Sequence, residues 1–121
     1  MSKMTSYTKG MWAEYMAVAL LTCKGYRILK HRYKTRFGEI DIIAKRGNII
    51  AFIEVKSRKR EGDALEAVQP KTQRRIENAA KDFISHNSQI CGNSLFRFDV
   101  IAVSKAFTIK HLDNAWVSPS Y

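Results

Sequence analysis

The sequence predicts an α/β protein with a mixed β-sheet of about five strands flanked by helices. Hydrophobic patterns follow the order helix, three strands, helix, two strands, and this order favours a mixed sheet covered by helices. Hydrophobic residues make up 45% of the chain and charged residues 26%, as in globular proteins. Because 121 residues suit one domain and are few for two, we expect a single domain over residues 1–121.

The N-terminal part of the chain predicts a helix and then a strand. From about Thr8 to Lys24, large apolar residues recur at steps of three and four, and Gly25 offers a C-terminal stop. Few charges interrupt this helix, so we expect it to be largely buried. Residues 26–35 alternate loosely and carry a basic rim, which is typical of a first strand.

The middle of the chain predicts a hairpin and a second helix. Residues 39–45 and 49–57 are β-branched and apolar, and Arg46-Gly47-Asn48 between them is a turn signal. Pro70 suits the first position of a helix whose apolar spacing continues to about His86.

Two polar loops and two further strands complete the expected fold. Residues 58–62 form a basic loop, and residues 87–94 form a loop rich in Asn, Ser and Gly. The apolar patterns of residues 95–103 and 106–111 predict a fourth and a fifth strand.

Positive charge is concentrated in one segment. The net charge is +10, and residues 24–60 carry twelve Lys and Arg against three acidic residues, whereas residues 61–121 carry seven of each sign. This pattern is the expected footprint of phosphate contacts, with a Lys-rich sheet edge that blunts aggregation as the alternative. The residues expected to bind a phosphate backbone are Arg32, Lys34, Arg36, Arg58, Lys59, Arg60, Lys71, Arg74 and Arg75.

Two aromatic residues, Tyr33 and Phe37, lie among these basic residues. They could stack on an unpaired base, although packing in the core or at its rim is the more frequent fate of such side chains.

The predicted hairpin brings two carboxylates together. With Gly47 and Asn48 at the centre of the turn, Asp41 faces Glu54, and directly opposed residues place their Cβ atoms about 4.5–5.5 Å apart. Lys56 points to the same face, because strand side chains alternate. The residues expected to fill the other face are Ile40, Ile42, Ala44, Ile49, Ala51, Ile53 and Val55.

Opposed carboxylates on a sheet repel each other, so this pair predicts a bound cation. Mg²⁺ accepts carboxylate oxygens while it keeps several waters, and Mn²⁺ is the alternative metal. The ammonium group of Lys56 could orient a water or stabilise charge in the transition state. The plainer interpretation is a surface pair of Glu54 and Lys56 beside a lone Asp41.

Short motifs in this region resemble those of a known family. Gly38-Glu39-Ile40-Asp41, followed after twelve residues by Glu54-Val55-Lys56, resembles the Asp-(x)n-Glu-x-Lys core of restriction-endonuclease-like nucleases. More closely, the chain resembles the YraN-like family of small predicted endonucleases, whose relatives in fold include archaeal Holliday-junction resolvases. The flanking blocks that agree are Glu14, Gly25-Tyr26-Arg27-Ile28-Leu29, Glu66-Ala67-Val68 with Pro70, and Arg97-Phe98-Asp99-Val100.

The resemblance implies a restriction-endonuclease-like fold and a Mg²⁺-dependent endonuclease acting on DNA, with branched or structured DNA suggested by fold analogy. By that analogy Asp41 and Glu54 bind the metal, the Val55 carbonyl adds a ligand, and Lys56 assists the water nucleophile. Glu14 resembles a first-helix glutamate that joins such sites, and its alternative is a helix carboxylate paired with a nearby lysine.

Two other classes of function stay open. One is a nucleic-acid-binding module that keeps the nuclease fold without cutting. The other is a basic subunit that serves only in protein assembly, which would leave the opposed carboxylates unexplained. For the nuclease, a two-fold homodimer would suit the cutting of both strands.

Cysteine, histidine and hydropathy patterns predict the compartment. Cys23 and Cys91 form no Cys-x-x-Cys pair, so we expect a reduced, cytoplasmic protein without a zinc site. The apolar run from Tyr15 to Cys23 is too short to span a bilayer, and Glu14 and Thr22 disfavour a cleaved signal peptide. No membrane partner is expected.

Overall fold

The computed structural model describes residues 6–58, 68–104 and 108–118. The predicted loop over residues 58–62 therefore lies outside the described residues, apart from the backbone of Arg58. The elements are α1 (Ser6–Cys23), β1 (Arg27–Lys34), β2 (Glu39–Arg46), β3 (Ile49–Arg58), α2 (Pro70–His86), α3 (Ser88–Cys91), β4 (Leu95–Ser104) and β5 (Ile109–Trp116). The predicted order of helix, three strands, helix and two strands is confirmed, with the single turn of α3 added.

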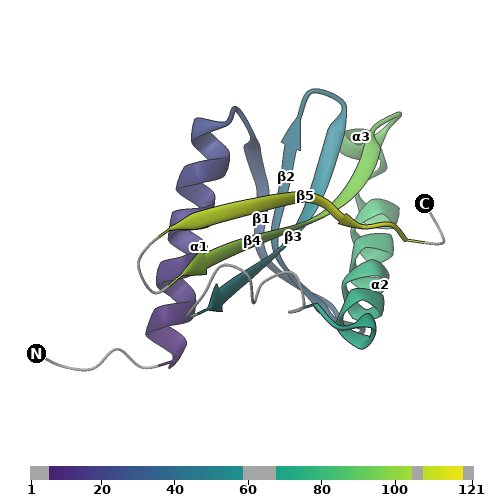
Figure 1. Cartoon of the computed structure of the whole chain (residues 1–121). Coiled ribbons are helices and arrows are strands. Elements are labelled where there is room, and N and C mark those ends of the chain that lie inside the picture. The colour runs from purple at the N-terminus through teal and green to yellow at the C-terminus, as the bar shows by residue number, and fades with distance from the viewer. Residues whose placement is uncertain (1–5, 59–67, 105–107, 119–121) are drawn as a thin grey trace, which may run out of the picture.

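The five strands form one open mixed sheet in the order β1-β2-β3-β4-β5. β3 and β4 are parallel, and every other neighbouring pair is antiparallel. The connection between β3 and β4 includes α2, as a parallel pair requires a long crossover. α1 covers one face of the sheet and α2 covers the other (Figure 1).

Each helix packs on its own hydrophobic cluster. On the α1 side, the small side chains of Ala13 and Ala17 are fully covered and let the helix lie close to the sheet. On the α2 side, Phe83 contacts Phe52 with ring centroids 6.1 Å apart, and Phe52 contacts Phe98 at 5.6 Å. Central strands buried on both faces explain why the hairpin is apolar at nearly every position.

The prediction that Ile40 shares a face with Ile42 is wrong. Ile42 belongs to the cluster under α1, whereas Ile40 belongs to the cluster under α2. Regular alternation is interrupted between the pairs His31↔Ile42 and Tyr33↔Ile40, where Arg32 of β1 adopts a positive φ of 60°. The sequence shows apolar residues but not the point at which the pleat changes face.

Two predicted boundaries also differ from the structure. The fifth strand runs from Ile109 to Trp116 and so extends past the predicted end at residue 111, because Trp116 stacks on Phe98 of β4 at 5.2 Å and extends the pairing. Residues 106 and 107 of the predicted strand lie outside the described residues. The expected loop after α2 contains α3, whose Cys91 is buried in the cluster under α2.

No helix within the described residues is both long and apolar enough to cross a membrane.

A buried ionic network joins β4, β5 and the end of α1. The carboxylate of Asp99 has no exposed surface and accepts hydrogen bonds from Arg97, from the N–H of Asn114 and from His111 Nε2 at 2.8 Å. Lys24 Nζ donates to His111 Nδ1 at 2.6 Å. Burial alone would raise the pKa of Asp99, but the three donors together lower it below its usual value. Asp99 therefore acts as a hydrogen-bond partner that ties β4 to β5.

Replacement of Asp99 by alanine should strongly destabilise the fold, because Arg97 and His111 would lose their buried acceptor. We expect a loss of about 3–5 kcal/mol in the free energy of unfolding at pH 7, measured by urea denaturation. The matched control is Asp113→Ala, which removes an exposed carboxylate from the same sheet edge. Equal stability losses in the two variants would contradict this role of Asp99.

Candidate active site

The two predicted carboxylates lie where the sheet forks. β2 pairs with β3 from Arg46↔Ile49 to Ile42↔Ile53, in the register that the hairpin predicts. Beyond this point β2 continues along β1 while β3 continues along β4, so the two strands separate.

Asp41 and Glu54 are consequently not paired across the β2–β3 ladder. The prediction that they face each other directly in this ladder is wrong. Instead, the backbone N–H of Val55 donates a hydrogen bond to Asp41 Oδ2 at 2.8 Å. The side chain of Asp41 thereby bridges the fork between β2 and β3, and its position is fixed by the backbone of the opposite strand.

Both carboxylates line one pocket, which we call the acidic pocket. Its volume is about 260 Å³. Asp41 and Glu54 contribute from the sheet, and the first turns of α2 form the opposite wall. The full lining consists of Glu39, Asp41, Glu54, Thr72, Arg75 and Ile76.

Burial and neighbouring negative charges increase the free-energy cost of ionising the carboxyl groups in the acidic pocket. Burial raises the pKa of Asp41 to about 7, with further contributions from the charges of Glu54, Glu14 and Glu39, while the Val55 N–H opposes the shift. Burial also raises the pKa of Glu54, against the attraction of Lys56. A positive group in the pocket would therefore be bound favourably.

Lys56 lies beside Glu54, as strand alternation predicts. Its Nζ atom is 3.3 Å from Glu54 Oε1, and the lysine and glutamate side chains are 22% and 14% exposed. Since both groups are largely shielded from water, the ammonium group is held against Glu54 rather than free in solvent.

Glu14 of α1 has two partners on β1. Arg32 donates to it from Nε at 3.0 Å and from Nη2 at 3.2 Å, and His31 Nε2 lies 2.9 Å from the same carboxylate. The expected alternative of a lysine partner is thus replaced by an arginine and a histidine. The charge of Glu14 still acts on Asp41 and Glu54, as their raised pKa values indicate.

The predicted phosphate-binding residues are distributed around this region. Lys34 and Arg36 are exposed at the end of β1 and in the turn that follows, and Arg32 is half-buried against Glu14. Lys71, Arg74 and Arg75 are exposed on the first turns of α2. Lys59, Arg60 and the side chain of Arg58 lie outside the described residues.

Two pocket residues escaped the sequence prediction, Glu39 and Thr72. Glu39 stands two positions before Asp41, and this spacing alone places both on one side of a strand. Thr72 stands one helical turn before Arg75 and Ile76, so the period of α2 could have identified it. Gln73, the next residue of α2, does not line the pocket: its side-chain amide donates to the Val68 carbonyl at 2.9 Å.

Gly38 sets the distance between the sheet and α2. A Cβ atom at this position would lie 2.5 Å from the carbonyl oxygen of Arg75, which is too close for any side chain. The turn before Gly38 is fixed by Thr35, whose N–H donates to the Gly38 carbonyl at 2.8 Å and whose Oγ1 accepts from the N–H groups of Phe37 and Gly38. This close approach explains the glycine of the Gly38-Glu39-Ile40-Asp41 motif.

These features define a mixed α/β protein with a half-buried carboxylate pair at a fork of its sheet. Residues 13–103 match the model of the Uncharacterised protein family UPF0102, and the chain belongs to this family. A UPF0102 protein of Mesorhizobium japonicum is 43% identical over 115 residues, which cover 95% of this chain and 91% of the relative. A UPF0102 protein of Chelativorans sp. is 42% identical over 118 residues, with 98% and 94% covered. This family is the YraN-like group, so the predicted resemblance is confirmed.

Substitution of Gly38 by alanine should force the β1–β2 turn away from α2. We expect a loss of about 1–3 kcal/mol in the free energy of unfolding, because the clash is with backbone that cannot rotate away. Gly47→Asn is the control, since Gly47 has no neighbour within 4 Å and asparagine tolerates its φ of 60°. A smaller loss for Gly38→Ala than for the control would contradict this packing.

The raised pKa of Asp41 should make the metal-free protein less stable as the pH increases. The pKa is about 7 in the folded chain, against about 3.9 for an unfolded aspartate. Between these values the folded state keeps a proton that the unfolded state has released, so stability present below about pH 4 is lost as pH rises to about 7.

Urea denaturation in EDTA would measure this effect as the stability of wild type minus that of Asp41→Asn. The subtraction removes the pH dependence of all groups that do not interact with Asp41. We expect the difference to fall as pH rises, and a difference independent of pH would show that the carboxyl is not perturbed.

Proposed function

We propose that this protein is a metal-dependent phosphodiesterase, an endonuclease that acts on DNA. The observation that carries the proposal is the convergence of Asp41 and Glu54 in one half-buried pocket, with the ammonium group of Lys56 in contact with Glu54. Burial and mutual repulsion of such a pair cost free energy that a bound cation would offset, and perturbed carboxyl groups in a pocket are typical of functional sites.

The donor set suits a hard divalent cation. Mg²⁺ binds through one or two carboxylates together with waters and substrate phosphates, so it does not need a full protein cage. Among the described residues no group of three or more His, Cys, Asp or Glu side chains is arranged to hold a metal, and Asp41 and Glu54 would act as the pair. Because Asp41 Oδ2 already accepts from Val55, Oδ1 would serve as the ligand atom.

The side chains around the pocket divide the remaining work. A divalent cation, when bound, neutralises phosphate charge and makes a nearby water more acidic. Lys56, oriented by Glu54, would position the attacking water and stabilise negative charge in the transition state. Arg75 on the α2 wall would contact the phosphate from the opposite side.

The charge of the chain supports a nucleic-acid substrate. A protein of net charge +10 attracts a polyanion over a long range, and the exposed cations of β1 and α2 stand on either side of the acidic pocket. DNA with a branched or otherwise structured form is the substrate that we infer, on the analogy of fold alone.

One observation favours a second candidate, a nucleic-acid-binding module that does not cut. Glu54 is already paired with Lys56, and Glu14 with Arg32, so part of the negative charge is neutralised without a metal. Such a module would bind nucleic acid with strong salt dependence and would be insensitive to Asp41→Ala.

A cleavage assay on junction, flap, single-stranded and duplex DNA tests the proposal, with Mg²⁺, Mn²⁺ or EDTA present. Lys56→Ala should reduce the rate by about 10²- to 10³-fold, because a positioned donor is lost. The matched control is Lys45→Ala, which removes a lysine from the same hairpin whose partner is the Ile90 carbonyl. Full activity of Asp41→Asn would contradict the site.

Metal binding is followed separately by the melting temperature in Mg²⁺ or Ca²⁺. A cation that binds the folded state raises the melting temperature, so the shift should persist in Lys56→Ala and vanish in Asp41→Asn. Salt-sensitive DNA binding without any cleavage or metal shift would favour the non-catalytic module.

A further inference from the structure

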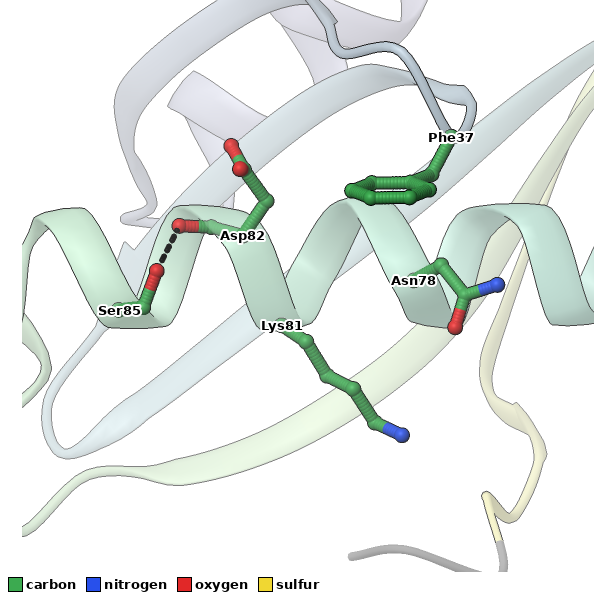
Figure 2. Close-up of a pocket in the computed structure, with 5 residues that line it drawn as sticks. All are labelled: Phe37, Asn78, Lys81, Asp82 and Ser85. Atoms are coloured by element: carbon green, nitrogen blue, oxygen red, sulfur yellow. Dashed lines mark hydrogen bonds between the residues drawn. The ribbon is translucent and has the colours of Figure 1, made fainter.

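A second groove lies beside the acidic pocket, between the β1–β2 turn and the outer face of α2. We call it the Phe37 groove, and its volume is about 430 Å³, within the range of about 300–1,000 Å³ typical of small-ligand sites. Figure 2 shows the ring of Phe37 over α2, with Asp82 and Asn78 on either side and Lys81 extending outwards. Ser85 completes the lining.

Phe37 is an exposed aromatic ring held on a fixed turn. Its side chain is 52% exposed and belongs to neither hydrophobic cluster. Its N–H is bonded to Thr35 Oγ1 at 3.0 Å, and the next residue, Gly38, is pressed against α2. The ring is therefore presented to solvent without the conformational freedom of a flexible loop, which lowers the entropic cost of binding.

The polar groups of the groove suit the edge of a nucleobase better than a phosphate. The Asp82 carboxylate is fixed by the hydroxyl of Tyr33 at 2.6 Å, and it would repel a phosphate. Carboxylate and amide groups, such as those of Asp82 and Asn78, can accept from or bridge the donors and acceptors of a base. Two positively charged side chains lie near the groove. Lys81 is part of its lining, and the Arg36 guanidinium lies 5.9 Å from the Phe37 ring centroid.

The two cavities follow each other along α2. Phe37 precedes Glu39 of the acidic pocket by two residues, and Asn78 follows Arg75 of that pocket by three. The middles of the two linings on α2 are about seven residues apart, which is about 11 Å along the helix, comparable with about three base spacings of 3.4 Å.

We propose that the Phe37 groove binds an unpaired nucleobase, stacked on the Phe37 ring, within a few nucleotides of the phosphate held at the acidic pocket. This inference rests on the proposed function for the identity of its ligand, and it adds a preference for DNA with unpaired nucleotides. A base within a duplex is already stacked on its neighbours, whereas an unpaired one is free to stack on an aromatic side chain.

The test measures binding in EDTA, so that it does not depend on cleavage. Two DNAs are compared by fluorescence anisotropy: a fully paired duplex, and the same duplex with one unpaired nucleotide. Phe37→Ala should weaken binding of the second DNA by between about 5-fold and about 150-fold and leave the paired duplex unchanged. Phe37→Trp should retain the preference, because it keeps an aromatic face.

A matched control and a direct reporter complete the design. Leu95→Ala removes another exposed apolar side chain, 62% exposed and outside both cavities, and should leave binding of both DNAs unchanged. With 2-aminopurine, a fluorescent base quenched by stacking, at the unpaired position, wild type should quench the emission and Phe37→Ala should not.

Equal losses on both DNAs, or quenching that survives in Phe37→Ala, would overturn the inference. The outcome is separable from that of the proposed function. Binding that depends on Phe37 together with no cleavage would retain the groove and reject the nuclease. Cleavage that depends on Lys56 and is indifferent to Phe37, with no preference for the unpaired DNA, would retain the nuclease and reject the groove.

Discussion

β2 and β3 run side by side as far as Ile42 and Ile53 and then separate, and the acidic pocket depends on this separation. In a continuous ladder, Asp41 would sit among closely spaced neighbours, with no room for a ligand between the strands. At the fork, its carboxylate instead accepts a hydrogen bond from the Val55 N–H, which fixes its position beside the acidic pocket. The fork has two arms, the end of β3 that carries Glu54 and the start of β2 that carries Asp41. The first arm is held by parallel pairing with β4, and the second by antiparallel pairing with β1.

Electrostatics and packing oppose each other around this fork. Four carboxylates (Glu14, Glu39, Asp41 and Glu54) influence one another within a strongly basic protein. Burial is tolerable because Arg32, Lys56 and a backbone N–H each neutralise part of the charge. In the proposed function, the positive net charge of the chain would attract a polyanion at long range, and the local negative charge of the acidic pocket would attract a divalent cation.

Much of this arrangement could be predicted from local sequence patterns. Turn chemistry at Gly47 and Asn48 determined the hairpin register, and alternation placed Lys56 beside Glu54. The fork itself was not predictable, because it depends on the further pairing of β2 with β1 and of β3 with β4, and local sequence patterns do not carry that information. For the same reason the prediction for the face of Ile40 was wrong. The length of β5 was not predictable either, because it depends on the contact of Trp116 with Phe98 of β4.

The parallel pairing of β3 with β4 also has a consequence for the order of folding. β1, β2 and β3 are joined by short turns, so their contacts are local and cost little loop-closure entropy. Ile49 and Leu95 are separated by the crossover that contains α2 and α3, so we expect this non-local pairing to form last. The arm of the fork that carries Asp41 is thus assembled early, and the arm that carries Glu54 is fixed only when the sheet is completed.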